Sequence, residues 1–153
     1  GANSEIKTIT GAAVAIHGLD APLLRTASVQ SSFFGLNVVS QPEPDVALED
    51  GEILNAGAIE VGIIHTPGHT KGGISIYIED EGALFTGDTL FAGSIGRTDL
   101  PGGSYDDLIS SINNGILTLP DDVMVFPGHG PHTTIGEERR TNPFLAEAEE
   151  QEG

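Results

Sequence analysis

The sequence predicts an α/β fold, in which short strands end in glycine-containing turns and a helix packs against the sheet that the strands form. Residues 59–65 and 74–78 largely alternate apolar with polar or small side chains, which is the period of two of half-buried strands. Residues 104–116 place Tyr, Leu and Ile side chains on one helical stripe. Residues 123–126 form a further apolar, β-branched run that leads into a turn. This order of elements is typical of a helix layered on a sheet.

The first fifty residues carry shorter signals. Residues 12–16 favour a strand, residues 20–27 a short helix, and residues 41–50, rich in Pro and acidic side chains, a surface loop. We expect one domain over residues 1–145, followed by an acidic flexible tail over residues 146–153.

Turn and capping signals delimit the later elements. The polar residues 79–82 join the strand at 74–78 to the apolar residues 83–85 in the manner of a β-hairpin. Ser104 is suited to cap the N-terminus of the predicted helix, and Pro120 is suited to stop it.

The composition argues against several classes of partner. Six Lys and Arg against 23 Asp and Glu give a net charge of −17, which repels phosphate backbones and anionic membranes. The sequence contains no apolar run of about 18 residues and no cysteine, so it offers neither a membrane span nor a disulfide framework. We therefore expect a cytoplasmic protein that binds neither nucleic acid nor membrane.

Three polar side chains follow the ends of predicted strands in glycine-containing turns: His69, Asp88 and His129. Taken singly, each is more typical of a turn residue than of a ligand. Their joint occurrence, each directly after a strand, favours convergence at one edge of a sheet. Imidazole and carboxylate are ligands that suit Zn²⁺, Fe²⁺ or Mn²⁺, so the pattern predicts a site for one or two metal ions.

The string from His65 to Arg97, together with the Pro-Gly-His-Gly turn at 127–130, resembles the metallo-β-lactamase superfamily. Within it the sequence is similar to the short glyoxalase II-like (hydroxyacylglutathione hydrolase-like) form, which lacks a C-terminal helical domain. The resemblance implies a four-layer αββα sandwich and one or two Zn²⁺ ions, with Fe²⁺ or Mn²⁺ as alternatives. It also implies that His69 completes the ligands of one metal, Asp88 bridges two metals, and His129 serves the second.

One motif of the family has no counterpart in this sequence. The superfamily's His-x-His-x-Asp-His string, which supplies the other ligands and the catalytic base, is missing, and the sequence begins at Gly1-Ala2-Asn3. The resemblance therefore implies an N-terminally truncated fold, covering its C-terminal two-thirds. We assign the catalytic base to no residue here, and expect this chain alone to bind metal weakly and to be inactive.

Arg97 matches a basic residue that binds a carboxylate of the substrate in glyoxalase II enzymes. The alternative is an ion pair with the nearby Asp99. Pro131 and His132 stand where that family carries a substrate-contacting Tyr. We expect His65 to be a core histidine close to the site rather than a ligand.

The resemblance leads to one preferred function and two alternatives. The preferred function, for the full-length form, is metal-dependent hydrolysis of small-molecule thiolesters of the hydroxyacylglutathione (lactoylglutathione) type through a metal-bound hydroxide. An iron-dependent persulfide dioxygenase on the same fold shares the Gly-Arg-Thr-Asp string at 96–99, although those enzymes commonly carry a nearby Cys. The third hypothesis is a catalytically silent binding paralogue. The sequence leaves the oligomeric state open.

Overall fold

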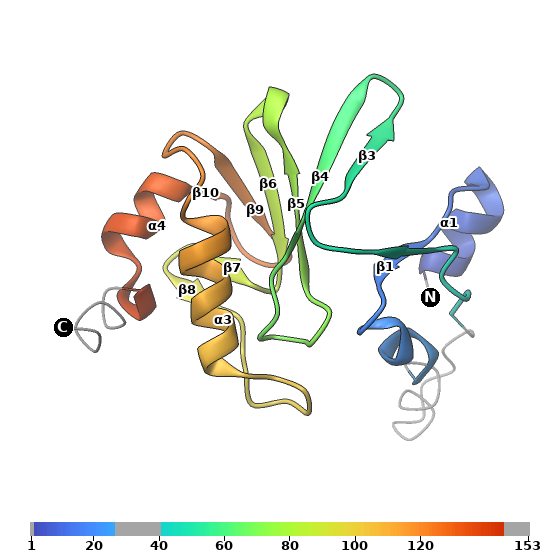
Figure 1. Ribbon diagram of the computed structural model, residues 1–153, viewed down its shortest axis with the longest axis horizontal. Helices are drawn as coiled ribbons and strands as arrows, with labels where there is room; N and C mark the ends of the chain where they lie inside the picture. The colour runs from blue at the N-terminus through green and yellow to red at the C-terminus, as the bar shows by residue number, and fades with distance from the viewer. Residues whose placement is uncertain (1, 27–40, 146–153) are drawn as a thin grey trace. The chain divides into compact units, whose positions relative to one another are not determined.

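The computed structural model describes residues 2–26 and 41–145, and these fall into two compact units, Gly1–Leu48 and Glu49–Gly153. Figure 1 labels most of the helices and strands of both units. The single domain expected over residues 1–145 stays a prediction. The acidic tail at 146–153 lies outside the described residues.

The first unit contains helix α1 (Ala2–Thr10), strand β1 (Ala15–His17) and strand β2 (Val46–Leu48), with further helical residues at 21–26. β1 and β2 pair in parallel, with Ala15 opposite Val46. The prediction of a loop throughout residues 41–50 was therefore wrong at β2. Three residues with mixed burial are too short a run to show the period of a strand, and only the pairing with β1 defines it.

Asp45 ties α1 to the entry of β1 in this unit. Its Oδ2 accepts hydrogen bonds from Lys7 Nζ and, at 2.8 Å, from the Val14 backbone N–H. The Lys7 ammonium, followed by the Val14 N–H, lowers the pKa of the Asp45 carboxyl below its ordinary value.

The second unit contains a six-stranded sheet in the order β10-β9-β6-β5-β4-β3. Its strands are β3 (Ile53–Ala56), β4 (Ile59–His65), β5 (Ile74–Ile78), β6 (Ala83–Gly87), β9 (Met124–Pro127) and β10 (Thr133–Thr134). Strands β7 (Leu90–Phe91) and β8 (Ser94–Ile95) form a separate hairpin. The strands predicted at 59–65, 74–78, 83–85 and 123–126 are confirmed, with shifts of one or two residues at some ends.

β6 and β9 are the one parallel pair in the six-stranded sheet, whose other neighbouring strands are antiparallel. β5 and β6 form the predicted hairpin, joined through the 3₁₀ turn η1 (Glu79–Glu81) and Gly82, whose φ of 56° is left-handed. The parallel pair places the turns that follow β6 and β9 at the same edge of the sheet.

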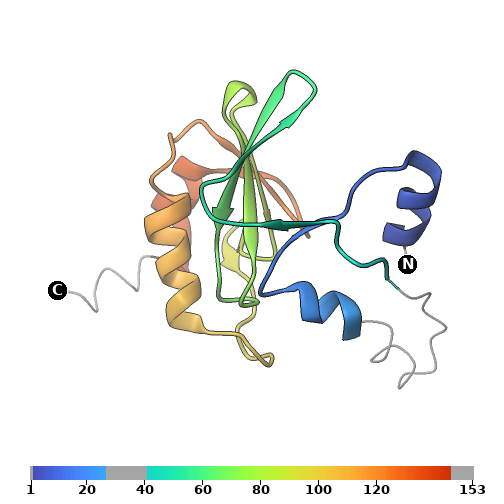
Figure 2. The same cartoon turned by 45° about the vertical axis from the view of Figure 1, so that its right-hand side comes forward.

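Two helices cover one face of this sheet, α3 (Tyr105–Ser111) and α4 (Ile135–Thr141), and α3 continues into a π-helical turn, η2 (Ile112–Ile116). Figures 1 and 2 show both helices on the same side of the strands. They enclose a core of fully or almost fully buried side chains: Leu84, Leu90, Leu108, Ile112, Ile116, Val123, Val125, Ile135 and Leu145. The core fixes α3 and α4 against this face of the sheet.

The N-terminus of α3 is capped as the sequence predicts. Ser104 is extended (φ −151°, ψ 120°), and its Oγ accepts a hydrogen bond from the Asp107 N–H at 3.2 Å. The helical residues end at Ile116, before Pro120.

Within residues 2–26 and 41–145, the helices are too short and too polar for any of them to cross a membrane.

Ser104→Ala is expected to lower the free energy of unfolding by about 1 kcal/mol, because it leaves the Asp107 N–H without its acceptor. Chemical denaturation measures this change. Ser104→Asp is the matched control and should stay close to wild type, since Asp caps as well as Ser. Equal stability of Ser104→Ala and wild type would show that the cap contributes nothing.

Candidate metal site

The turn after β4 carries His69 and is docked on α3. Gly68 has a φ of 138° and lies so close to Leu108 that a β-carbon would collide with the helix backbone. The Gly68 carbonyl accepts a hydrogen bond from the Ser104 N–H at 2.8 Å, and Ser111 Oγ donates to the Pro67 carbonyl at 2.7 Å. The helix predicted from the sequence thus holds the first candidate ligand turn in place.

The turn after β6 carries Asp88. Gly87 takes a left-handed φ of 51°, which turns the chain at the end of the strand. Buried Thr86 closes the turn, because its Oγ1 donates to the Leu90 carbonyl at 2.9 Å and its own carbonyl accepts from the Thr89 N–H at 3.1 Å.

The turn after β9 carries His129, and it meets the Asp88 turn directly. The Gly128 N–H donates to the Gly87 carbonyl at 2.7 Å. A β-carbon on Gly128 would lie 2.6 Å from Asp88 Oδ1, so any larger residue here would push the carboxylate aside.

The three predicted ligands come together around one carboxylate. His69 Nε2 lies 3.6 Å from Asp88 Oδ2, and His129 Nε2 lies 3.3 Å from Asp88 Oδ1. Each imidazole therefore approaches a different oxygen of Asp88, as expected of a bridging carboxylate. The side chains are open to solvent to different degrees, with 23% of His69, 35% of Asp88 and 77% of His129 exposed.

The hydrogen bonds of His69 fit a cation. Its Nδ1 lies 2.8 Å from the Arg97 carbonyl, which can only accept, so Nδ1 carries a proton. In the neutral ring the lone pair is then on Nε2, and it faces the Asp88 carboxylate. Two acceptors that face each other in this way leave a place where a metal ion could be bound by both.

The residues described do not complete such a site alone. In that part of the chain no group of three or more His, Cys, Asp or Glu side chains is arranged to hold a metal ion. The donor types fit Zn²⁺, Fe²⁺ or Mn²⁺, and the assignment of His69, Asp88 and His129 as ligands stays a prediction.

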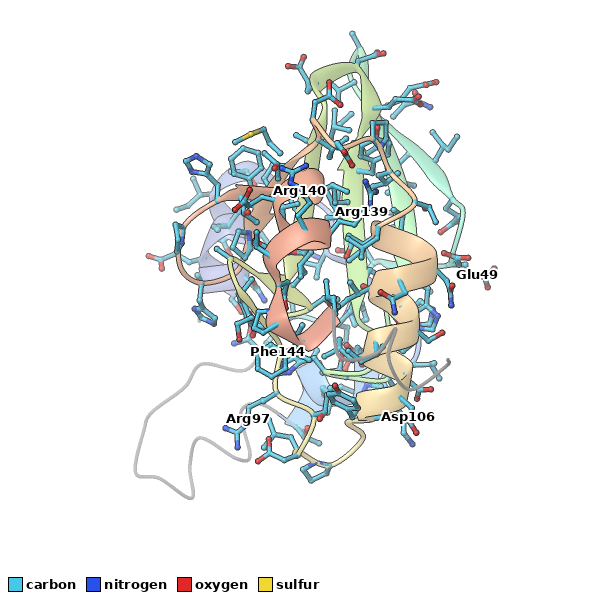
Figure 3. The ribbon with its side chains drawn as sticks, turned by 90° about the vertical axis from the view of Figure 1, so that its left-hand side faces the viewer. Glu49, Arg97, Asp106, Arg139, Arg140 and Phe144 are labelled. Atoms are coloured by element: carbon cyan, nitrogen blue, oxygen red, sulfur yellow. The ribbon has the colours of Figure 1, made fainter. Side chains whose placement is uncertain are left out.

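Arg97 forms the ion pair that the sequence analysis held as the alternative to substrate binding. Its Nε and Nη2 donate to the two carboxylate oxygens of Asp99, each at 2.8 Å. The Arg97 guanidinium lowers the pKa of Asp99 from 3.8 to about 2. Figure 3 shows the Arg97 side chain pointing outward into solvent. Arg97 contributes to the site through its backbone carbonyl, and its binding of a substrate carboxylate stays a prediction.

Two further histidines have partners other than Asp88. His65 Nε2 contacts the Lys71 carbonyl at 2.9 Å, and the His65 backbone N–H donates to Asp50 Oδ1 at 2.7 Å. His132 lies beside Phe126, with ring centroids 6.1 Å apart.

Sequence reasoning missed three residues that shape the site. A β-carbon on Gly96 would overlap the Asp88 carbonyl and touch the His69 side chain, so Gly96 allows those two turns to meet. The Phe91 ring lies 6.2 Å from the His129 ring. Glu138 is buried, and its carboxylate accepts hydrogen bonds from Gly93, two residues after Phe91, and from Thr133, four residues after His129. Gly96 could have been noticed in the Gly-Arg-Thr-Asp string. The burial of Glu138 could not, because its neighbours in α4 are charged as well and the sequence does not distinguish it from them.

Comparison with known proteins agrees with this architecture. The family model of the metallo-beta-lactamase superfamily matches residues 1–129, and the chain belongs to this superfamily. The predicted α/β metallo-β-lactamase fold is thereby confirmed.

Two relatives are similar over most of this chain. It is 45% identical over 124 residues to the hydroxyacylglutathione hydrolase GloC of Haemophilus influenzae, a match that covers 80% of this chain and 58% of GloC. It is 39% identical over 147 residues to the probable metallo-hydrolase YqgX of Bacillus subtilis, covering 95% of this chain and 69% of that protein. The chain thus spans little more than half the length of GloC.

Solved structures show the same fold. The crystal structure of the BLEG-1 B3 metallo-beta-lactamase matches with a TM-score of 0.87 and 39% identity, covering 95% of this chain and 70% of that one. TTHA1623 in a di-iron-bound form matches with a TM-score of 0.83 and 39% identity, covering 95% and 71%. ETHE1 from Myxococcus xanthus matches with a TM-score of 0.74 and 29% identity, covering 95% and 57%. A protein of this fold is thus known in a metal-bound form. The choice among Zn²⁺, Fe²⁺ and Mn²⁺ for this chain stays a prediction.

Gly128→Ala is expected to weaken metal binding by about tenfold or more, because the new methyl group would displace Asp88 Oδ1. Titration with Zn²⁺ followed by calorimetry measures the effect. Gly115→Ala is the control, since its β-carbon would make only an ordinary contact with Ile64, at 3.5 Å. Unchanged affinity in Gly128→Ala would contradict the close packing of the two turns.

The Asp99 carboxyl is expected to titrate with a pKa of about 2, and Arg97→Gln should raise that pKa towards its ordinary value of 3.8. Because the folded-state pKa is lowered, the stabilisation is complete above the unfolded pKa and is lost as the pH falls towards 2. Carboxyl carbon NMR shifts measured against pH test this. A pKa of Asp99 that does not respond to Arg97→Gln would argue against the ion pair in solution.

Proposed function

We propose that this chain belongs to a cytoplasmic, metal-dependent hydrolase that, in its full-length form, cleaves thiolesters of the hydroxyacylglutathione type. The observation that carries the proposal is the approach of two imidazoles, from separate turns, to the two oxygens of Asp88. The 45% identity to GloC supports the substrate class. Membership of the superfamily supports hydrolysis by a metal-dependent mechanism.

His69, Asp88 and His129 would hold one or two Zn²⁺ ions, or Fe²⁺ or Mn²⁺ in their place. When bound, such a metal lowers the pKa of a water molecule and polarises the scissile carbonyl. The Arg97 carbonyl keeps the proton of His69 on Nδ1, so that Nε2 stays directed towards Asp88. Asp88 then directs one carboxylate oxygen, Oδ2, towards His69 and the other, Oδ1, towards His129.

Arg97 would bind a carboxylate of the substrate in the same bidentate manner in which it now holds Asp99. Because both positions of its guanidinium fork are already used, substrate binding requires exchange of one carboxylate for the other. The exposed position of the Arg97–Asp99 pair, with 61% and 69% of the two side chains accessible, makes this exchange inexpensive.

Asp88→Asn in the full-length, metal-loaded protein should lower kcat/KM for a hydroxyacylglutathione thiolester by more than about 100-fold. Loss of a ligand costs more than loss of a group that supports one, which typically lowers affinity or activity about 10–100-fold. Asp80→Asn, on an exposed turn, is the control. Thiol release measures the rate, and full activity in Asp88→Asn would exclude the proposed site.

An iron-dependent persulfide dioxygenase is the second candidate. The Gly-Arg-Thr-Asp string at 96–99 favours it, and the di-iron form of TTHA1623 shows that a close fold relative binds iron. Oxygen uptake by the iron-loaded, full-length protein with glutathione persulfide distinguishes the two enzymes, since hydrolysis consumes no oxygen. Failure of the metal-loaded protein in both assays would favour the third candidate, a silent binding paralogue.

A further inference from the structure

Glu138 is a charged side chain almost completely buried in α4, with 2% of its surface exposed. Its carboxylate accepts three hydrogen bonds: Oε2 from the Gly93 N–H at 3.0 Å and Asn142 Nδ2 at 2.8 Å, and Oε1 from Thr133 Oγ1 at 2.7 Å. A buried carboxylate is costly unless it is hydrogen-bonded in this way. The three partners are therefore held firmly in relation to one another.

Two of these partners belong to the loops on either side of His129. Thr133 is the first residue of β10 and directly follows the loop of residues 128–132 that carries His129. Gly93 lies in the turn between β7 and β8, two residues after Phe91. The rings of Phe91 and His129 lie 6.2 Å apart, tilted by 35°. The Glu138 carboxylate thus connects the end of the His129 loop, through Thr133, with the turn that follows Phe91, through Gly93.

A second buried side chain strengthens the same connection. Asn142, with 1% of its surface exposed, uses its Nδ2 group both for Glu138 Oε2 and for the Ser94 carbonyl, the latter at 3.1 Å. Ser94 belongs to β8, next to Gly93. Figure 1 shows α4 alongside β10 and the β7–β8 hairpin, so the helix spans both loops.

We propose that Glu138 is a positioning residue of the metal site, which sets the His129 imidazole against Asp88 by holding Thr133 and Gly93. His129 needs such support because 77% of its side chain is exposed, so packing around the ring itself constrains it little. Its Nε2 nevertheless lies 3.3 Å from Asp88 Oδ1. The proposal deepens the proposed function and rests on it.

Thr133→Val tests the connection, because it removes the donor to Glu138 Oε1 while keeping the shape and strand preference of the side chain. Thr118→Val is the matched control, since Thr118 Oγ1 donates only to the Gly115 carbonyl at the end of η2. Zinc titration of the full-length protein should give an affinity about tenfold weaker in Thr133→Val and unchanged in Thr118→Val. Equal affinity of Thr133→Val and wild type would overturn the proposal.

A second pair of variants separates positioning from stability. Glu138→Gln should stay near wild type in zinc affinity, since its amide oxygen accepts from Gly93 and its amide nitrogen can donate to the Thr133 hydroxyl. Glu138→Ala should lose affinity as Thr133→Val does, whereas Glu137→Ala, on the exposed side of α4, should not. An affinity loss in Glu137→Ala equal to that in Glu138→Ala would show a general effect of α4 and contradict a positioning role.

A metal-free readout keeps this inference distinct from the proposed function. Proton NMR of the metal-free chain should show cross-peaks between the Phe91 and His129 rings in wild type and Glu138→Gln, and their loss in Thr133→Val and Glu138→Ala. Absence of Zn²⁺, Fe²⁺ and Mn²⁺ binding by the full-length wild type would refute the proposed function and leave this ring contact to decide about Glu138. Cross-peaks that persist in all four proteins would overturn the positioning role.

Discussion

The parallel pairing of β6 and β9 is the constraint on which the candidate site depends. It brings the ends of two strands that are forty residues apart in sequence to one edge of the sheet, where the Gly128 N–H binds the Gly87 carbonyl. Asp88 and His129 follow directly. The third turn, with His69, reaches the same place because Gly68 packs without a side chain against Leu108 of α3. Helix α3, which lies between β6 and β9 in the sequence, thus also holds the turn that carries His69.

The backbone directs the donors of this site as much as side chains do. The Arg97 carbonyl fixes the proton of His69, and Gly96, its neighbour, leaves room for Asp88 and His69 to approach each other. The guanidinium of Arg97 is turned outward and holds Asp99. One short segment therefore orients His69 through its backbone and pairs with Asp99 through its side chain.

The sequence predicted most of the elements that show the alternation of a strand or the residue types of a turn. The alternation in β4 and β5, the Ser104 cap, and the three polar turns after strands appear as local patterns, and their places are confirmed. β2 was missed because its three residues are defined by a partner strand thirty-one residues away. The role of Glu138 was also beyond reach, because Glu137 and Glu138 look alike in sequence and differ only in which side of α4 faces the loops.

Metal content of the full-length protein tests the central claim most directly, namely that the turn residues converging on Asp88 are metal ligands. The decisive comparison is between His69→Gln and His65→Gln, because His65 ends the strand that leads into the same turn but contacts the Lys71 carbonyl instead of Asp88. After loading with Zn²⁺ and removal of free metal, mass spectrometry should find metal in wild type and His65→Gln, and a loss of bound metal in His69→Gln. As much metal in His69→Gln as in wild type would contradict the account.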